Sequence, residues 1–528
     1  MMNSFLRASL IVLTISGLLF SNVYFGTVQA STDVTGIIAS DTTWTKANSP
    51  YSLTGNVLVY NGVTLTIEDG VTVNLDGYYI MVNGTLRARG SGTNKIHFNS
   101  GEITFTQYSS DWNEQTDSGC IIENANLYST YVGINFASPK INSNFILRIH
   151  VDGSAVISNN TINDGITVSS PSPIISYNII SGGVRISSDS TISHNTISGG
   201  VRVSSGSAVI SHNTISGGVD ASGGSPVISN NVISGGVSVY SKGLPIISHN
   251  TIMGGISVKE GSLIISNNTI NGGAIGIDLS PAGPIGSINA SILNNTITGG
   301  EIGINIAPSL TVSLYGYYTD ASISGNIIYG CTTAGIKVGG VSGQAGVTPR
   351  YNTATIEENT IINNNYGITG VTEPIRNNII ANNSVGISGG SLIERNTIIN
   401  NYYGIKGGNE IRNNTIVNNF IGVESGFSTL IYNNIHNNSE YNVRFTSSSN
   451  PNATYNWWGT TDIQAINQTI YDFKNDFNLG KVNFVPFLTE PNPEEMSTPI
   501  SEFPSIIILP LFLIATLAVI IIRKKMLR

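Results

Sequence analysis

Charged side chains are scarce in this sequence: Asp, Glu, Lys and Arg account for 11% of its 528 residues, whereas about 25% is usual in soluble globular proteins. The formal net charge is −8. A nucleic-acid partner needs a basic surface, so this balance argues against DNA or RNA binding. Ser, Thr and Asn must supply most of the polar surface instead.

Cysteine and methionine are also few, with two and six copies. Cys120 and Cys331 lie at least eight turns apart in the coiled fold inferred below, about 38 Å at ~4.8 Å per turn, whereas the Cα atoms of a disulfide are about 4.4–6.8 Å apart. We therefore expect no disulfide between them. No Cys-x-x-Cys, glycine-rich phosphate loop or nucleophile elbow occurs, so we expect no cofactor.

What the sequence does contain is a repeat. The phrase Asn-x-Ile recurs every 17 to 19 residues, with wider gaps of 27, 31 and 33 in the middle. This period is too short for paired-helix repeats, and the polar-apolar alternation within each repeat favours strands. The repeated asparagines are Asn160, Asn178, Asn195, Asn213, Asn231, Asn250, Asn268, Asn295, Asn326, Asn359, Asn378, Asn396, Asn414 and Asn433.

Two or three short β-segments with Gly, Ser and Asn corners fit into eighteen residues, which predicts an all-β fold, a parallel β-helix with about 18 residues per coil. Equivalent side chains of successive coils would then stack in columns. We expect the repeated asparagines to form a structural ladder at one corner, hydrogen-bonded to the coils above and below. The expected interior pairs are Val184/Ile186, Val201/Val203, Val219/Ala221, Val237/Val239 and Ile256/Val258.

The repeat pattern also predicts the organisation of the exported body. Residues 31–150 would form irregular N-terminal coils and a cap over the first sheet edge. Residues 151–440 would form the β-helix repeats, with longer insertions at 271–350, a usual location of binding function in solenoids. Residues 441–488 are rich in aromatic side chains and would close the last coil.

The two ends of the chain predict its location. Residues 1–30 have the pattern of a secretory signal peptide, and 505–522 form an uncharged apolar stretch long enough to span a bilayer. The basic residues at 523–528 would stay in the cytoplasm, and the Pro- and Glu-containing linker 489–504 would be extended. We therefore expect a single-pass anchored protein on the extracellular face, with a cytoplasmic C-terminus.

One tail motif leaves an alternative open. The sequence Glu502-Phe503-Pro504, an apolar span and a basic stop resemble the tripartite surface-anchoring signals processed by archaeal sortase-like enzymes. Under that alternative the tail would be cleaved, although the protein would stay at the surface. An exported protein could also be glycosylated at its Asn-x-Ser/Thr sequences, best at Asn452 and Asn467.

An outward column of the predicted coil holds Arg185, Arg202 and Asp220 on three adjacent turns. This polar strip could bind a sugar acid, but it contains no pair of acids for glycoside hydrolysis. We favour the interpretation of a solvated charge ladder, and catalysis by these three residues is the alternative. Further along, a strict 18-residue register would stack Glu260 with Asp278. If the register instead shifts by one residue, Ile275 and Ile277 are buried and Asp278 lies over Lys259 as an ion pair. We favour the shifted register because it buries both isoleucines.

Histidines and aromatic residues give the remaining candidates. His194, His212 and His249 precede ladder asparagines in a column that also accepts Asn and Tyr, so no metal is needed to explain them. The insertions contain Tyr315, Tyr317 and Tyr318 together with Asp278, Glu301 and Asp320. Trp457 and Trp458 in the aromatic segment would either plug the last coil or offer a carbohydrate-stacking platform.

The phrases at 361–368 and 398–405, Ile-Ile-Asn-Asn-Asn-Tyr-Gly-Ile and Ile-Ile-Asn-Asn-Tyr-Tyr-Gly-Ile, resemble the repeat of right-handed parallel β-helix proteins of the pectate-lyase-like superfamily, specifically the NosD-type group. The stretch 62–70 and the Asn-Trp-Trp-Gly at 456–459 are similar to the ends of archaeal surface members. The resemblance implies a right-handed coil and a choice between polysaccharide lyases or hydrolases, carbohydrate-binding proteins and maturation factors. A lyase would use an arginine with a calcium ion.

Fold alone cannot choose among these activities. Because no acid pair stands out, the sequence favours a structural or carbohydrate-binding surface protein whose partner is a polysaccharide or cell-envelope polymer. The alternative is a polysaccharide lyase or glycoside hydrolase with its site in the 271–350 insertions, and calcium as its ion if it is a lyase.

Overall fold

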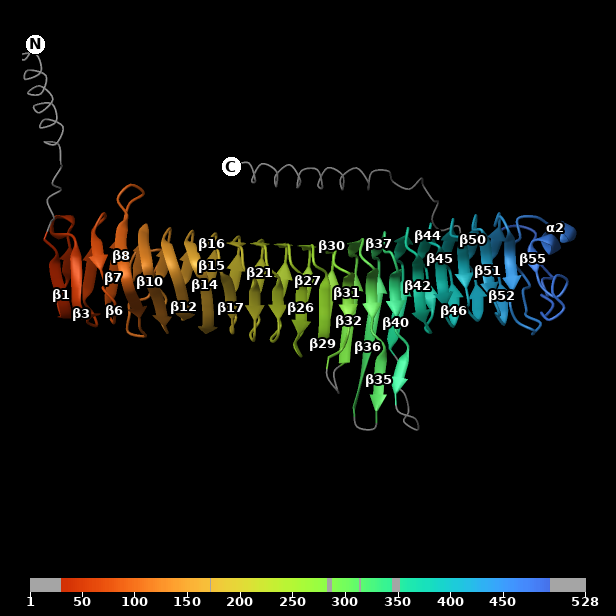
Figure 1. Ribbon diagram of the computed structural model, residues 1–528, viewed down its shortest axis with the longest axis horizontal. Helices are drawn as coiled ribbons and strands as arrows, with labels where there is room; N and C mark the ends of the chain where they lie inside the picture. The colour runs from red at the N-terminus through yellow and green to blue at the C-terminus, as the bar shows by residue number, and fades with distance from the viewer. Residues whose placement is uncertain (1–29, 171, 283–286, 313–314, 344–351, 494–528) are drawn as a thin grey trace, which may run out of the picture. The chain divides into compact units, whose positions relative to one another are not determined.

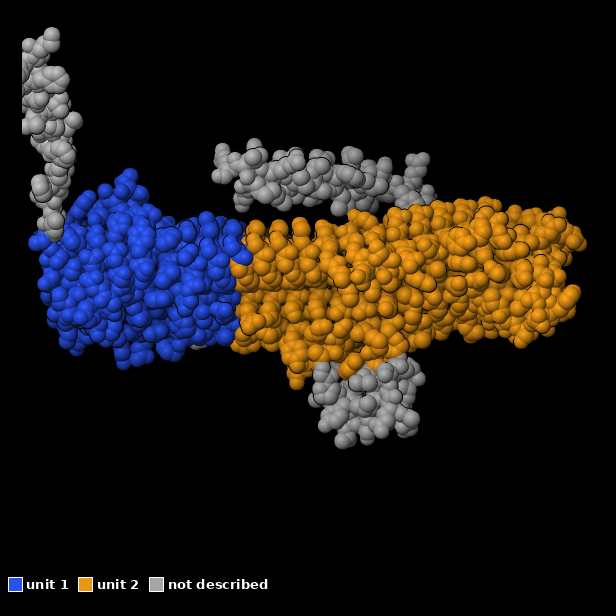
Figure 2. All heavy atoms as spheres, viewed as in Figure 1, with its two compact units in different colours: residues 1–198 blue, residues 199–528 orange. Residues whose placement is uncertain are grey.

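The computed structural model describes residues 30–170, 172–282, 287–312, 315–343 and 352–493. The chain divides into two compact units, Met1–Ser198 and Gly199–Arg528, coloured separately in Figure 2. The predicted signal peptide up to residue 29, the transmembrane segment 505–522 and the basic tail lie outside the described residues, as does the linker beyond residue 493. No helix within the described ranges is long and apolar enough to span a membrane.

Both units are all-β and consist of short strands that pair in parallel with the equivalent strand of the next coil, as in a β-helix solenoid (Figure 1). Each regular coil contributes to three stacks of strands. Stack 1 follows a glycine-containing corner, stack 2 comes next along the chain, and stack 3 follows the ladder asparagine. Because strands in a stack keep the same register, equivalent side chains lie above one another at about 4.8 Å.

In the first unit, long strands run through stack 3 and then stack 1: β1 (Thr32–Ile38), β3 (Tyr51–Val59), β8 (Ile96–Phe105), β10 (Ala125–Asn135), β12 (Phe145–Asp152) and β14 (Thr161–Ser170). Stack 2 contains β2 (Thr42–Trp44), β4 (Thr64–Ile67), β7 (Thr85–Arg89), β9 (Ile121–Glu123), β11 (Lys140–Asn142), β13 (Val156–Ser158), β15 (Ile174–Ser176) and β18 (Thr191–Ser193). The shorter strands are β5 (Thr72–Asn74), β16 (Ile179–Ile180) and β19 (Thr196–Ile197) in stack 3, and β6 (Tyr79–Val82) and β17 (Gly183–Ile186) in stack 1. The 3-10 helix η1 (Lys46–Asn48) connects β2 to β3.

In the second unit, stack 1 contains β20 (Val201–Val203), β23 (Val219–Ala221), β26 (Val237–Tyr240), the first half of β29 (Ile256–Ser266), β31 (Ile275–Leu279), β34 (Ile302–Ile306), β38 (Ala334–Val338), β42 (Tyr366–Val371), β45 (Val385–Gly389), β48 (Tyr403–Lys406), β51 (Ile421–Ser425), β54 (Tyr441–Phe445) and β55 (Ile470–Tyr471). Stack 2 contains β21 (Val209–Ser211), β24 (Val227–Ser229), β27 (Ile246–Ser248), the second half of β29, β32 (Ser287–Leu293), β36 (Tyr315–Ser324), β40 (Thr353–Glu357), β43 (Ile375–Arg376), β46 (Leu392–Glu394), β49 (Glu410–Arg412) and β52 (Thr429–Ile431).

Stack 3 of this unit contains β22 (Thr214–Ile215), β25 (Val232–Ile233), β28 (Thr251–Ile252), β30 (Thr269–Asn271), β33 (Thr296–Thr298), β37 (Ile327–Tyr329), β41 (Thr360–Ile362), β44 (Ile379–Ala381), β47 (Thr397–Ile399), β50 (Thr415–Val417) and β53 (Asn434–His436). The strands β35 (Ser309–Val312) and β39 (Val341–Gly343) pair with each other, and β35 also forms a hairpin with β36 that projects from the coils (Figure 1). The α-helix α2 (Ile463–Gln468) lies in the aromatic segment near the C-terminal end of the unit.

The interior of the coils is filled by β-branched side chains, which pack well on pleated strands. The residues expected there do face inward and are at most 1% exposed: Val184, Ile186, Val201, Val203, Val219, Ala221, Val237, Val239, Ile256 and Val258. In the first unit the wider coils hold larger groups, including Phe98 and Phe105. The residues 31–150, expected to be irregular, contribute parallel strands to the same three stacks from Thr32 onward.

The repeated asparagines form a buried hydrogen-bonded ladder within each unit, from Asn144 to Asn195 and from Asn213 to Asn456. Asn231 is representative. Its Oδ1 accepts hydrogen bonds from the main-chain N–H of Asn213 at 2.9 Å and from the Nδ2 of Asn213 at 3.0 Å. Its Nδ2 donates to the carbonyl of Ile210 at 2.8 Å and to the Oδ1 of Asn250 at 3.0 Å.

A second ladder runs through the later coils of the second unit, five residues after the first. Its members are Asn364, Asn383, Asn401, Asn419 and Asn438, each with its main-chain N–H or side chain bonded to the next asparagine. Cys331 occupies the equivalent place in an earlier coil and donates its main-chain N–H to the Oδ1 of Asn364 at 2.9 Å. Both cysteines are free and buried.

The expected register around Asp278 was wrong. Asp278 pairs with Ser257, not with Lys259, and Glu260 pairs with Tyr240. Ile277 is buried, but Ile275 is only half-buried. This coil takes 21 residues from Ile256 to its partner Ile277, whereas the preceding strand pair, Ile252 with Ile270, is 18 residues apart, so the corner before Ile277 contains three extra residues. The predicted ion pair with Lys259 is nevertheless present, at 3.5 Å.

Candidate functional site

One outward-facing column of side chains follows stack 1 through the second unit, and we call it the outward column. Each member is in register with the next, so neighbours are about 4.8 Å apart. Its members are Arg202, Asp220, Ser238, Ser257, Asp278, Asn305, Lys337, Thr369, Ser388, Lys406, Glu424, Arg444 and Tyr471.

The first two members include the arginine and aspartate predicted from the sequence. Arg202 donates from Nε to Asp220 Oδ2 at 2.9 Å, and both side chains are well exposed. Arg185, the third candidate, lies in β17 of the first unit, where it is exposed and in register with Thr167. The structure therefore brings Arg202 and Asp220 together as a surface ion pair.

Asp278 lies in the middle of the outward column and is held by neighbours. Its Oδ1 accepts hydrogen bonds from the hydroxyl of Ser280 at 2.6 Å and from Nδ2 of Asn305 at 2.8 Å. Its Oδ2 pairs with the ammonium of Lys259. The carboxylate is fixed in place by two hydrogen bonds and a cation, which suits a positioning or binding role.

A charged and aromatic cluster lies near the C-terminal end of the column, formed by Tyr403, Lys406, Glu424, Arg444 and Tyr471. Glu424 is 13% exposed and lies between two cations, with Lys406 Nζ 3.3 Å from Oε2 and Arg444 Nη1 3.5 Å from Oε1. Its buried Oε2 has the lysine charge beside it but no hydrogen bond of good geometry. Lys406 lies 4.6 Å from the Tyr403 ring centre and Arg444 5.8 Å from that of Tyr471.

The acids of the outward column are too far apart to cooperate in hydrolysis. Asp220 and Asp278 are three coils apart, about 14 Å, and Asp278 and Glu424 six coils apart, about 29 Å. Glycosidases need two carboxyl groups separated by about 5–9.5 Å. The described residues also contain no group of three or more His, Cys, Asp or Glu side chains placed to hold a metal ion.

The residues predicted in the insertions do not converge. Tyr317 and Tyr318 lie on β36 and are half-buried, whereas the side chain of Tyr315 is outside what the structure describes. Asp320 accepts a hydrogen bond from the Thr353 hydroxyl in stack 2. Asp278 belongs to stack 1, so these two acids lie on different faces of the coil.

The tryptophans differ in exposure. Trp458 is 3% exposed and packs edge-on against Phe484, with ring centres 6.4 Å apart. Trp457 is half-buried and pairs with Asn434 at the start of β53. The geometry therefore gives Trp458 the role of a plug and leaves only Trp457 partly accessible to a ligand.

The histidine column has a backbone explanation. His194, His212 and His249 have φ of 57° to 58°, in the left-handed region, at the turn before the ladder asparagine. Asn230 and Tyr177 adopt the same conformation, so the position selects a turn. Tyr177 also stacks on His194 with ring centres 4.8 Å apart.

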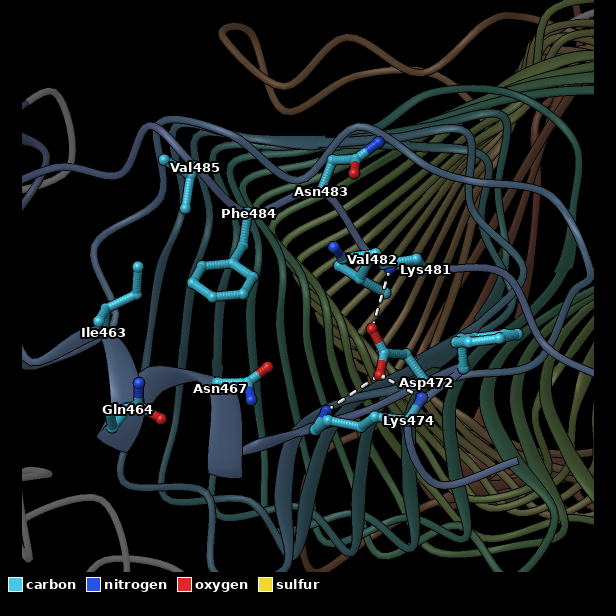
Figure 3. A pocket seen from close by; sticks show the side chains of 11 residues that line it. Ile463, Gln464, Asn467, Asp472, Lys474, Lys481, Val482, Asn483, Phe484 and Val485 are labelled. Atoms are coloured by element: carbon cyan, nitrogen blue, oxygen red, sulfur yellow. Dashed lines mark hydrogen bonds and ion pairs between the residues drawn. The ribbon is translucent and has the colours of Figure 1, made fainter. Parts of the chain in front are cut away.

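Sequence reasoning missed a cavity of about 620 Å³ in the aromatic segment. Figure 3 shows residues of α2 on one side of it and Asp472 and Lys474 on the other. It is lined by Ile463, Gln464, Asn467, Asp472, Phe473, Lys474, Lys481, Val482, Asn483, Phe484 and Val485. The density of aromatic residues between 471 and 484 was the signal available in the sequence.

The two glycosylation candidates occupy different settings. Asn452 is exposed, and its Oδ1 accepts hydrogen bonds from the Thr454 hydroxyl at 2.8 Å and the Thr454 N–H at 3.1 Å. Asn467 is half-buried and lines the cavity. A glycan on Asn467 would therefore occupy the cavity, whereas one on Asn452 would project into solvent.

No protein-family model matches this sequence, and no curated protein matches it either.

Proposed function

We propose that this chain is a cell-surface protein that binds an extended carbohydrate polymer along its outward column and does not cleave it. In this proposal the fold is a right-handed parallel β-helix of the pectate-lyase-like, NosD-type kind. Residues 505–522 anchor it in the membrane unless the tail is processed. The observation that carries the proposal is the outward column itself, in which polar and charged groups keep one register while the acids remain isolated.

The spacing of the column supports binding of a polymer. Twelve coil-to-coil steps of about 4.8 Å extend over about 58 Å, so a long chain can touch many positions at once. Each contact of a Ser, Thr, Asn or Lys side chain with a sugar hydroxyl is weak, but contacts made by one polymer add up through effective concentration. Tyr403 and Tyr471 provide aromatic surface beside the charges at one end.

The arrangement supports binding better than hydrolysis or elimination. Asp220 and Glu424 are each paired with a cation, and Asp278 is held by Lys259 and two hydrogen bonds. A lyase that uses calcium needs several oxygen ligands at one point, whereas the column offers one carboxylate per site. An enzyme would have to place its acid and base elsewhere.

The test is a combined retention and turnover screen of the full-length chain against acidic and neutral polysaccharides, with and without calcium. We expect retention without product release. The double variant Lys337→Ala/Lys406→Ala should bind more weakly, whereas Lys242→Ala, which removes an exposed lysine outside the column, should not. New reducing ends or unsaturated products would favour the lyase or hydrolase alternative, and no retention by any polymer would overturn the binding proposal.

A further inference from the structure

The cavity in the aromatic segment has the size and the construction of a small-ligand site. Its volume of about 620 Å³ lies within the range of about 300–1,000 Å³ found for small-molecule pockets. Three parts of the second unit line it: α2, the turn at 472–474 and the segment 481–485 (Figure 3). No member of the outward column lines it, although Asp472 directly follows Tyr471, the last member of that column.

Asp472 fixes the geometry of this cavity. The side chain is 5% exposed, and its Oδ2 accepts the main-chain N–H of Val482 at 3.0 Å. Its Oδ1 accepts a hydrogen bond from the ammonium group of Lys474 at 3.0 Å. One buried carboxylate therefore ties two lining segments together, and it neutralises Lys474. Such a satisfied hydrogen-bond network rigidifies the segments that line the cavity.

One aromatic ring of the lining, that of Phe473, is not needed to close the coil. Phe427 and Phe445 are fully buried and pack edge-to-face with ring centres 5.3 Å apart, and the buried Trp458 packs against Phe484. Phe473, in contrast, is 45% exposed at the cavity and contacts only the still more exposed Phe477 among aromatic partners in the described residues. Phe473 therefore presents an aromatic face at the cavity that a ligand can cover.

The charge of the lining selects an anion. Asp472 cancels Lys474, which leaves the exposed Lys481 without an ion pair among the residues that the structure describes. The amides of Gln464, Asn467 and Asn483 supply hydrogen-bond donors and acceptors of the kind that match adjacent sugar hydroxyls. Phe473 offers an apolar face for the C–H surface of a sugar ring.

We propose that this cavity binds a single sugar-acid unit, with its carboxylate at Lys481, its ring against Phe473 and its hydroxyls on the amides. The choice of a saccharide rests on the proposed function, whereas none of the lining residues belongs to the outward column. The cavity would thus recognise a uronate unit or chain end while the column holds the polymer. Glycosylation of Asn467 would block it.

The test is titration of the full-length chain, shown by intact mass to be unmodified at Asn467, with D-glucuronate and with D-glucose, followed by ligand-observed NMR. We expect glucuronate to bind and glucose to bind more weakly. Lys481→Met should weaken glucuronate binding about two- to fivefold, as expected for one exposed charge contact. Phe473→Ala should weaken it about two- to tenfold. The control Lys242→Met and the column variant Arg202→Ala should leave it unchanged.

Absence of glucuronate binding would overturn the inference, as would binding that neither Lys481→Met nor Phe473→Ala alters. Both substituted side chains are exposed at the cavity, so an unchanged melting curve will show that the variants fold. Polysaccharide retention without glucuronate binding would refute this site and leave the column. Glucuronate binding without polymer retention would refute the column and leave this site.

Discussion

Substitution of one ladder asparagine should destabilise the coils around it far more than substitution of an exposed asparagine. Asn250 is 2% exposed, and its side chain makes five hydrogen bonds. Its Oδ1 accepts from the N–H and the Nδ2 of Asn231 at 2.9 and 3.0 Å. Its Nδ2 donates to Ile228, Ser248 and Asn268 at 2.9 to 3.0 Å.

The magnitude follows from these bonds. Asn250→Ala leaves the buried N–H of Asn231 without an acceptor, which costs about 1–3 kcal/mol. At least two further bonds are lost at about 0.5–1.5 kcal/mol each. We therefore expect a loss of about 2–6 kcal/mol in the free energy of unfolding. In a solenoid each coil contacts only its neighbours, so the effect should be local.

Hydrogen–deuterium exchange by mass spectrometry checks the location of this effect, and urea unfolding its size. Exchange of the strands β24 to β30 should accelerate in Asn250→Ala. The matched control is Asn289→Ala, because Asn289 is exposed on stack 2. If the two variants exchange and unfold alike, the ladder does not stabilise the coils in the way described.

Three further predictions concern charge and burial. Glu394 is 6% exposed and is contacted by three arginine side chains at 3.0 to 3.4 Å. The substitution Glu394→Gln should lower the free energy of unfolding by about 1–3 kcal/mol, because three partly hydrated cations lose their counter-charge. An unchanged midpoint of urea unfolding would contradict this. The guanidinium of Arg89 lowers the pKa of Asp117, and the ammonium of Lys140 lowers that of Glu114. The stability that these ion pairs contribute is therefore present at neutral pH and is lost as the pH falls through the lowered pKa values. In the parent protein, proteolysis of the loop at 106–119 should rise only at acid pH, whereas in Asp117→Asn it should already be raised at neutral pH. Equal cleavage of the variant and the parent at neutral pH would refute this. Burial raises the pKa of the Cys120 thiol to about 11, so iodoacetamide at pH 8 should label it only after unfolding, and rapid labelling of the folded chain would show that the thiol is accessible.

Periodicity made much of the fold predictable. A residue such as Val219 or Asn231 recurs in every coil, so its environment follows from the repeat alone. The second ladder was harder to find, because Asn364 and its equivalents lie beside other asparagines and are absent from the early coils. The register at Asp278 was mispredicted since three extra residues between Ile270 and Ile277 lengthen that coil.

The candidate sites were only partly predictable. Arg202 and Asp220 lie in adjacent regular coils, and their contact follows from the period. Glu424 and Arg444 belong to the same column, but insertions change the spacing between them and the early coils. The cavity is formed by segments after the last regular repeat, where no period relates Asn467 to Phe473 or Lys481.

The most direct test of polymer binding by the outward column is lysine acetylation of the full-length chain, measured by mass spectrometry with and without the retained polysaccharide. Lys337 and Lys406 lie on the column, and Lys242 lies outside it; all three are exposed. The account predicts that the polymer slows acetylation of Lys337 and Lys406 and leaves Lys242 unchanged. Equal protection of all three, or protection of Lys242 alone, would contradict it.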